Sequence, residues 1–480
     1  MNQLYLGDCL DVLRKYIKDE SVDLIYIDPP FNSKRNYNIF FDDKEIQTQR
    51  VAFEDTWSYK SVGASLLELQ TVKNEPLHTL LNAYKLVAPQ VFPYLVMMTL
   101  RILELHRVLK ETGSFYLHCD PTASHYLKTI CDAIFNEKNF RNEITWCYDT
   151  GGRSKTNFPR KHDIIFWYGK TKNNRFFYDA VALQRDTTTM HEPILVDEDG
   201  RSYQRNIKNN KEYRYYLDKG TLPNDWWIDI QALNPAAKER LGYPTQKPRA
   251  LLERIIQASS NEGDLILDGF CGCGTTLDAA EYLKRKWIGI DISPIAIGLM
   301  KLRLQDSYKT DLSKFTIRGV PKDKESAIEL WVKNPFAFQD WWIMEFEVFS
   351  STFGKKGADQ GVDGLGMYLI PTVEQPIKAA FQVKGGKVQS KDIDALLGAM
   401  VKHKCELGVF LTIQSPTEPM LKTVANSGHF SAAGFNYPRL QILTLEEFFS
   451  GKTLQLPKFN ITFKNAQSIS KFVDQSGLDL

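Results

Sequence analysis

This 480-residue chain has few cysteines, a net charge close to zero and no long apolar run. The seven cysteines form no Cys-x-x-Cys pair, which argues against a zinc site and against a disulfide framework. The chain has 60 basic and 58 acidic residues, so its net charge is small. An acidic partner such as nucleic acid must therefore be bound by local basic patches. The chain has no membrane-length apolar run and no secretion-signal pattern at its start. The sequence therefore predicts a cytoplasmic protein without a membrane span.

The pattern of apolar residues indicates a globular α/β protein of more than one domain. Hydrophobic residues make up 43% and charged residues 25% of the chain, which are ordinary globular values. Residues 1–145 alternate short apolar strands, such as 23–28, with helical stretches, and the pattern returns over 241–305 and from 331 onward. Strands interleaved with helices are typical of parallel sheets, so we expect an α/β fold in both parts.

Basic and aromatic residues gather in the segment 146–240. Between residues 153 and 175 the sequence has seven cations and a single acid, Asp163. Further along, between residues 201 and 219, lysines and arginines are interleaved with tyrosines. Cations suit phosphates, and tyrosines suit bases or sugars. The segment is therefore expected to contact nucleic acid, and the alternative is an ordinary solvated surface.

A glycine-rich loop connects two predicted strands. The strand 265–268 runs into the loop, then a helix, and then a second strand that ends at Asp291. Gly272 and Gly274 allow a tight turn and a close backbone approach to a ligand. The start of the helix offers free N–H groups to a carboxylate, and Asp291 can accept both ribose hydroxyls. The loop predicts a nucleoside-cofactor site, although a loop of this kind alone can be a structural turn, and the chain has no Walker sequence.

Asp28, Pro29, Pro30 and Phe31 follow directly on the first buried strand. Ligands bind at strand ends in open α/β sheets. The two prolines fix the backbone, so a carbonyl group is held beside the Asp28 carboxylate. Two acceptors next to an aromatic ring suit an exocyclic amine on a planar base, whereas Asp-Pro-Pro alone could be a turn.

Together, the Asp28–Phe31 motif and the loop 270–275 resemble the DNA amino-methyltransferases, which carry D-P-P-[FY] and F-x-G-x-G-T. Four further segments match the same family, at residues 7–13, 113–120, 161–170 and 243–256. The D-P-P motif precedes the glycine loop, an order similar to that of the beta class, which includes Type III modification subunits. The resemblance covers residues 1–305. It implies a Rossmann-like domain with the target-recognition region 146–240 inserted.

By this resemblance the chain is a site-specific methyltransferase that uses S-adenosylmethionine to modify adenine N6 in double-stranded DNA. Asp28 and the Pro29 carbonyl would accept the amine hydrogens and draw the nitrogen lone pair toward the methyl group. Phe31 would stack on the flipped base. Asp28 at the first position favours adenine, and cytosine N4 stays open. A small-molecule methyltransferase would explain neither the basic segment nor the C-terminal motif described below.

The resemblance also assigns residues to the cofactor. Phe270, Gly272, Gly274 and Thr275 would line its methionine end, Asp291 would hold the ribose, and Asp8 with Cys9 would approach the adenine. Asp268, just before the loop, belongs to the same set. Lys247 would reach the cofactor carboxylate, and its alternative is a solvated lysine at the start of a helix.

A second motif follows a predicted linker, 306–324. Asp363 lies in a glycine-flanked turn, and Gln382 and Lys384 alternate onto one face of a predicted strand. Metal-assisted hydrolysis of a phosphodiester needs a carboxylate, a second ligand and a lysine near the attacking water. The pattern D…[EQ]-x-K resembles the Mrr-like branch of the restriction-endonuclease superfamily, with Gln382 in place of the commoner Glu.

This second resemblance implies a smaller α/β nuclease domain over 325–455, followed by a tail, 456–480. Asp363 and Gln382 would bind Mg²⁺, and Lys384 would orient the water. The chain is thus similar to a restriction-modification protein with both activities. In the alternative, a methyltransferase for adenine N6 or cytosine N4 carries an inactive C-terminal domain that only binds DNA or a partner. Whether the chain acts as a homodimer, or with a restriction or specificity subunit, is left open.

Overall fold

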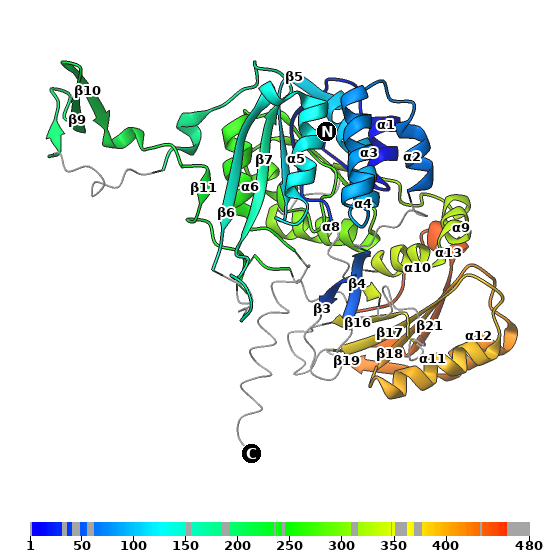
Figure 1. Cartoon of the computed structure of the whole chain (residues 1–480). Coiled ribbons are helices and arrows are strands. Elements are labelled where there is room, and N and C mark those ends of the chain that lie inside the picture. Colours follow the sequence, from blue (N-terminus) through cyan, green and yellow to red (C-terminus); the bar gives the residue numbers. More distant parts are fainter. Residues whose placement is uncertain are drawn as a thin grey trace.

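The structure is a computed structural model (Figure 1). It describes residues 2–30, 36–40, 49–54, 62–149, 155–183, 193–234, 237, 239–241, 245–308, 315–346, 348–350, 362–368, 377–432 and 434–457. Of the predicted site residues, Phe31 lies outside the described residues, as does nearly all of the predicted tail. Within the described part of the chain, no helix is both long and apolar enough to cross a membrane.

A nine-stranded sheet forms the centre of the larger domain, in the order β11-β6-β7-β5-β2-β12-β13-β1-β14. Neighbouring strands are parallel, except that β7 runs antiparallel to β5 and β6. The strands are β1 (Asn2–Leu6), β2 (Val22–Ile27), β5 (Leu109–Cys119), β6 (Phe140–Cys147), β7 (His162–Gly169), β11 (Trp226–Trp227), β12 (Leu265–Asp268), β13 (Lys286–Asp291) and β14 (Phe315–Arg318).

The two halves of the predicted methyltransferase meet in the middle of this sheet. β2 is buried along its whole length, as is typical of parallel strands covered on both faces. β12 pairs with β2 in parallel, so that Ile266 lies beside Leu24. The glycine loop and the Asp28 motif, far apart in the sequence, therefore follow adjacent strands.

Helices cover both faces of the sheet (Figure 1). One face packs against α1 (Cys9–Tyr16), α2 (Gly63–Leu69), α3 (Glu75–Val87), α4 (Phe92–Val108) and α5 (Ser124–Phe135). The other face packs against α6 (Arg249–Ser259), α7 (Thr275–Tyr282) and α8 (Pro294–Tyr308). The predicted doubly covered α/β architecture is confirmed.

The segment 146–240 contributes both to the sheet and to a separate feature. β7 and β11 belong to the nine-stranded sheet, whereas β8 (Leu195–Val196), β9 (Ser202–Lys208) and β10 (Lys211–Tyr216) form a three-stranded sheet of their own. The β9–β10 hairpin extends away from the body of the domain (Figure 1). The short 3₁₀ helices η1 (Glu137–Asn139), η2 (Tyr178–Val181) and η4 (Leu217–Lys219) occur in the connections.

The predicted linker 306–324 also carries structure. β14 pairs in parallel with β1 and closes one side of the nine-stranded sheet. The strand is only four residues long and its neighbours are polar, so the sequence pattern gave no sign of it. A further hairpin, β3 (Asn36–Phe40) with β4 (Gln49–Glu54), follows the Asp28 motif.

A second α/β domain follows β14. Its sheet has the order β15-β16-β17-β18-β21, in which β17, β18 and β21 are parallel. The strands are β15 (Phe349–Ser350), β16 (Gly364–Tyr368), β17 (Ile377–Lys384), β18 (Leu407–Thr412) and β21 (Leu440–Thr444), with the hairpin β19 (His429–Ala432) and β20 (Phe435–Pro438) beside them. The helices are α9 (Lys324–Lys333), α10 (Pro335–Met344), α11 (Ser390–Lys402), α12 (Glu418–Asn426) and α13 (Leu445–Phe449). The two domains touch where Met344 of α10 packs against Gly298 of α8.

Candidate active sites

The predicted methyl-transfer residues gather at one edge of the nine-stranded sheet. Because β2, β12 and β13 are parallel neighbours, their carboxyl ends meet there. Asp28 follows β2, Asp268 ends β12 and Asp291 ends β13. The antiparallel β7 begins at the same edge and adds Asp163. Four carboxylates that are distant in the sequence are thus brought to one edge.

The Asp28 carboxylate forms an ion pair with Lys247. Nζ of Lys247 donates to Oδ2 of Asp28 at 2.6 Å, and only 9% and 16% of the two side chains are exposed. Oδ1 of Asp28 is buried and has no hydrogen-bond partner among the described residues. A buried acceptor of this kind is costly unless a ligand supplies the donor. The geometry therefore leaves one carboxylate oxygen for a bound N–H group.

Two carboxylates hold the glycine loop in place. Asp268 accepts from the backbone N–H of Phe270 at 3.0 Å and from the hydroxyl of Thr276 at 2.5 Å. Asp291 accepts from the backbone N–H of Gly272 at 2.8 Å. The predicted cofactor residues of the loop are thus connected by hydrogen bonds.

The start of α7 is fixed just after this loop. Gly274 has a φ of 77°, and a Cβ there would lie 2.5 Å from Cγ of Met300, so the turn requires glycine. Arg303 donates to the Thr275 hydroxyl at 3.1 Å and pairs with Asp278 at 2.8 Å. Both side chains of this ion pair are 5% exposed. The first turn of α7 is therefore held rigidly where its free N–H groups could meet an anionic group.

Burial sets the protonation of the two loop carboxylates. Loss of hydration raises the pKa of Asp268 to about 7, although hydrogen bonds from Thr276 and Phe270 oppose the shift. The same loss of hydration raises the pKa of Asp291 to about 6. A cationic ligand beside them would favour their ionised forms, because it would supply the compensating charge.

Asp8 and Cys9 begin α1 beside the loop. Asp8 caps the helix and its Oδ2 pairs with Arg101 at 2.5 Å. The thiol of Cys9 is buried against Gly269, and burial raises its pKa to about 12. The thiol is therefore neutral and packs as an apolar group. Both residues lie next to the glycine loop, and their contact with a cofactor stays a prediction.

A hydrogen-bonded chain that the sequence did not reveal lies beside Asp28. The Tyr26 hydroxyl contacts Nδ1 of the fully buried His118 at 2.8 Å, and Nε2 of His118 contacts Asp163 at 3.0 Å. The Tyr148 hydroxyl donates to the other oxygen of Asp163 at 3.2 Å. The only sequence signal was that His118 and Asp163 each fall in a segment matching the methyltransferase family.

The second domain brings together the predicted nuclease residues. The backbone N–H of Asp363 donates to the Phe381 carbonyl at 2.8 Å, and its carboxylate accepts from the Val383 N–H at 2.7 Å. Asp363 is therefore fixed beside the end of β17, where Gln382 and Lys384 lie. This juxtaposition agrees with the expectation from the spacing.

Lys384 also has a partner that sequence reasoning missed. Its Nζ lies 3.3 Å from Oδ1 of Asp392, which is 7% exposed at the start of α11. Oε1 of Gln382 is buried without a hydrogen-bond partner among the described residues. An oxygen in that position fits a ligand of Mg²⁺, which binds oxygen donors. The described residues contain no cluster of three or more His, Cys, Asp or Glu side chains that could hold a metal ion.

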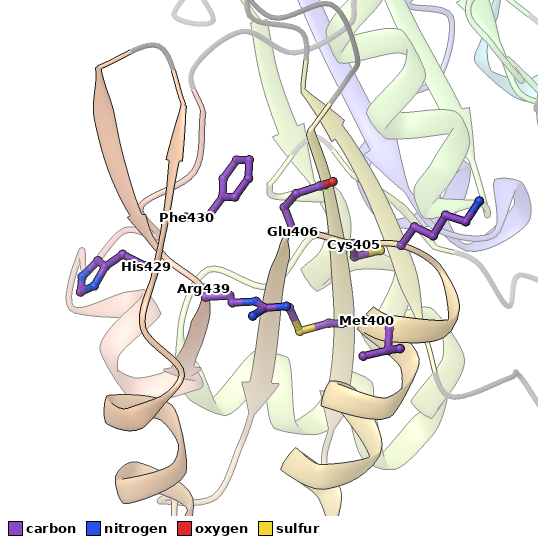
Figure 2. Close-up of a pocket in the computed structure, with 8 residues that line it drawn as sticks. Met400, Cys405, Glu406, His429, Phe430 and Arg439 are labelled. Atoms are coloured by element: carbon purple, nitrogen blue, oxygen red, sulfur yellow. The ribbon is translucent and has the colours of Figure 1, made fainter.

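A cavity in the second domain lies away from these residues. It is lined by Met400, Val401, Lys404, Cys405, Glu406, His429, Phe430 and Arg439 (Figure 2). The Glu406 carboxylate accepts from the backbone N–H of Lys378, near the start of β17. Gln382 and Lys384 lie at the other end of that strand, so the cavity is separate from the candidate nuclease site.

Comparison with known proteins finds two family matches. The model described as "DNA methylase" matches residues 22–301, and the model described as "Restriction endonuclease" matches residues 341–430. The first match spans the Asp28 motif and the glycine loop, and the second spans Asp363, Gln382 and Lys384.

Individual relatives match about two thirds of this chain. The DNA adenine methyltransferase YhdJ of Escherichia coli (strain K12) is 29% identical over 309 residues, which cover 64% of this chain and 84% of the relative. The Type II methyltransferase M.BamHI of Bacillus amyloliquefaciens is 28% identical over 316 residues, covering 65% of this chain and 60% of the relative. Among solved structures, the PvuII DNA methyltransferase (cytosine-N4-specific) aligns with a TM-score of 0.39 at 17% identity, covering 65% of this chain and 90% of that one.

The raised pKa of Asp268 predicts a pH-dependent effect on stability. An acid whose pKa rises from 3.8 to about 7 on folding stabilises the native state fully below pH about 4, and this contribution is lost as the pH rises through about 7. Asp268→Asn has no such titration. Its melting temperature relative to the wild type should therefore be higher at pH 8 than at pH 5, in melts without cofactor. Glu262→Gln, which changes an exposed acid, serves as the control, and an Asp268→Asn difference equal at both pH values would contradict the assignment.

Proposed function

This chain belongs to the DNA methylase family and carries a restriction-endonuclease domain behind the methylase, and from that premise we propose that it methylates adenine N6 at a specific sequence in double-stranded DNA. S-adenosylmethionine is the proposed methyl donor. The observation that carries the proposal is Oδ1 of Asp28, which is buried at the strand end beside the glycine loop and has no hydrogen-bond partner among the described residues. An amine N–H of a flipped base is the donor that this oxygen lacks.

The residues of the chain would bind and orient the reacting groups. The bound cofactor supplies a methyl group that is activated by its positive sulfur. Oδ1 of Asp28 and the Pro29 carbonyl would accept the two hydrogens of the base amine, so that its lone pair points away from them. As the N–C bond forms and the C–S bond breaks, positive charge appears on nitrogen, and these two acceptors stabilise it. The amine then gives one proton to solvent.

The other site residues would hold the donor. Asp291 would accept the ribose hydroxyls, and the N–H groups at the start of α7 would meet the carboxylate of the methionine part. Phe270, Gly272, Gly274 and Thr275 would surround that part. The raised pKa values of Asp268 and Asp291 suit this role, because a cationic donor would offset the cost of ionising buried carboxylates.

Adenine is proposed over cytosine on two grounds. The first is Asp28 itself, since Asp in this position resembles the adenine-specific members of the family. The second is the name of the E. coli relative, which is a DNA adenine methyltransferase.

The β9–β10 hairpin is proposed to contact the DNA target. Residues 205–215 are exposed on both faces of this two-stranded ribbon. Lys208 lies directly opposite Lys211, and Arg205 directly opposite Arg214. Like charges at opposite positions destabilise a hairpin, so the Lys208–Lys211 pair does not serve the hairpin's own stability, whereas Arg214 is paired with Glu212 at 2.8 Å. A polyanion beside the ribbon would remove the repulsion, and a two-stranded ribbon fits the major groove.

The second domain is proposed to cut DNA with Mg²⁺. Asp363 would bind the ion together with Oε1 of Gln382, which has no hydrogen-bond partner in the described part of the chain. Lys384, held by Asp392, would orient the attacking water. The bound ion would stabilise negative charge on the scissile phosphate. The hydrogen bond to Asp363 from the N–H of Val383, which lies between Gln382 and Lys384 in the sequence, supports this proposal over an inactive domain.

Asp28→Ala is expected to abolish methyl transfer and to leave cofactor binding within a few fold of the wild type. The Asp28 carboxylate is assigned to the base, whereas the cofactor residues lie on β12, β13 and α7. The measurements are incorporation of labelled methyl groups into genomic DNA and calorimetric binding of S-adenosylmethionine. Asp11→Ala, in the exposed face of α1, is the control. Turnover of Asp28→Ala near the wild-type rate would exclude the mechanism.

The double variant Lys208→Ala/Lys211→Ala is expected to bind DNA of every sequence more weakly. If both lysines contact phosphates, the slope of log K against log salt should fall by about two. The melting temperature should not fall, because the two substitutions remove a repulsion between like charges. An unchanged salt slope would show that the hairpin does not contact the DNA backbone.

Asp363→Asn and Lys384→Met are each expected to lower Mg²⁺-dependent cleavage of unmodified plasmid by orders of magnitude and to leave methylation intact. The matched control is Lys387→Met, an exposed lysine in the loop after β17. Reactions with EDTA give the metal-free baseline. If the wild type and Asp363→Asn leave plasmids of many sequences equally intact, the domain is a binding module.

A further inference from the structure

We propose that Lys247 is a positioning residue for methyl transfer, which fixes the Asp28 carboxylate through Oδ2 and so presents Oδ1 to the base amine. This inference rests on the proposed function. It gives Lys247 a different role from the one expected by family resemblance, in which it reaches the cofactor carboxylate. The juxtaposition that carries it is a short, buried ion pair between a loop residue and the carboxylate that would contact the base.

The ion pair has the geometry of a fixed contact. The N–O distance is 2.6 Å, and Lys247 is 9% exposed. An exposed lysine has many rotamers and gains little from an ion pair, but a buried one loses that freedom on folding and is held by its partner. Lys247 also lies 3.5 Å from the carbonyl oxygen of Thr245, which further limits its head group.

The backbone of the loop around Lys247 is held in one conformation, which fixes the direction of the Lys247 side chain. The side-chain amide of Gln246 accepts from the Leu241 N–H and donates to the Glu239 carbonyl, both at 2.7 Å, so the preceding residue is clamped on two sides. Thr245 has a φ of 61°, a left-handed conformation that is unfavourable for a β-branched residue. Such strain persists only where the surroundings impose it, and it is concentrated at functional sites.

The residue that follows completes the support. Pro248 caps α6 with its φ fixed by the ring, so the chain on the other side of Lys247 is also rigid. The backbone of Lys247 is thus held by a clamped amide before it and a proline after it. A surface lysine without a fixed partner would not require a rigid backbone on both sides.

The two oxygens of Asp28 have different environments as a result. Oδ2 is occupied by Lys247, and Oδ1 is buried with no partner among the described residues. Methyl transfer needs one well-oriented acceptor, because a carboxylate free to rotate would place the amine lone pair away from the methyl group. Lys247 removes that freedom through its contact with Oδ2.

Other charged groups surround this pair. Besides burial, which is the larger cause, the Asp28 charge helps to raise the pKa of Asp268, at the end of β12. It also helps to raise the pKa of the buried Tyr26 and Cys119, for which burial is again the larger cause. Burial alone would raise the pKa of Asp163, but His118 and then Lys247 lower it. Lys247 therefore acts on two carboxylates, and it forms a direct ion pair with Asp28.

The test compares Lys247→Met, which removes the charge, with Lys247→Arg, which keeps it. Methyl transfer to genomic DNA is measured at saturating S-adenosylmethionine and again at varied cofactor concentration. For Lys247→Met we expect kcat to fall roughly 100-fold, the scale for a misplaced reacting group. The KM for S-adenosylmethionine should stay within a few fold of the wild type, because Lys247 is assigned to Asp28 and not to the cofactor. Lys247→Arg should restore much of kcat.

Controls separate this role from a cofactor or folding role. Lys286→Met, an exposed lysine at the opposite end of β13, should match the wild type. A rise in KM for S-adenosylmethionine with kcat unchanged would overturn the proposal and leave the proposed function standing. Absence of methyl transfer by the wild type would overturn both. If Lys247→Met does not fold, Lys247→Gln gives the charge-free comparison, and a wild-type kcat in that variant would also overturn the proposal.

Discussion

The parallel pairing of β2 with β12 is the interaction on which the methyl-transfer site depends. It places Asp28 and the glycine loop at adjacent strand ends, although most of the N-terminal domain separates them in the sequence. A shift of β2 by one residue would turn the side chains that pack against α1–α5 toward α6–α8, and the reverse, so the packing on the two faces fixes the pairing. The site is therefore positioned by the core of the domain and not by loop contacts alone.

The same arrangement buries several carboxylates at the carboxyl edge of the nine-stranded sheet. The cost of burying each one is offset in a different way. Asp28 is paired with Lys247, Asp163 is held by His118 and Tyr148, and Asp268 keeps a raised pKa. In the second domain, Asp392 is likewise paired with a lysine, Lys384. At each site one acceptor, Oδ1 of Asp28 or Oε1 of Gln382, has no hydrogen-bond partner within the residues that the structure describes. Each domain thus combines an ion pair with one nearby oxygen that could accept a hydrogen bond from a ligand or bind a metal ion.

Much of this could be predicted from the sequence. The buried strands β2, β12 and β17 are short apolar runs next to recognisable motifs, so their extent and the resemblance to both families are confirmed. The strand β14 was missed because four residues in a polar segment give no periodic signal. The Lys247–Asp28 and Lys384–Asp392 pairs were missed because they depend on which loops the fold brings together. The expected contact of Phe31 with a base lies outside the described residues.

The central claim is that one oxygen of Asp28 receives the amine of adenine. The most direct measurement is mass spectrometry of nucleosides from DNA treated with the purified protein and isotope-labelled S-adenosylmethionine. The account predicts labelled N6-methyldeoxyadenosine in a single sequence context. Label found only in N4-methyldeoxycytidine, or in no nucleoside, would contradict it.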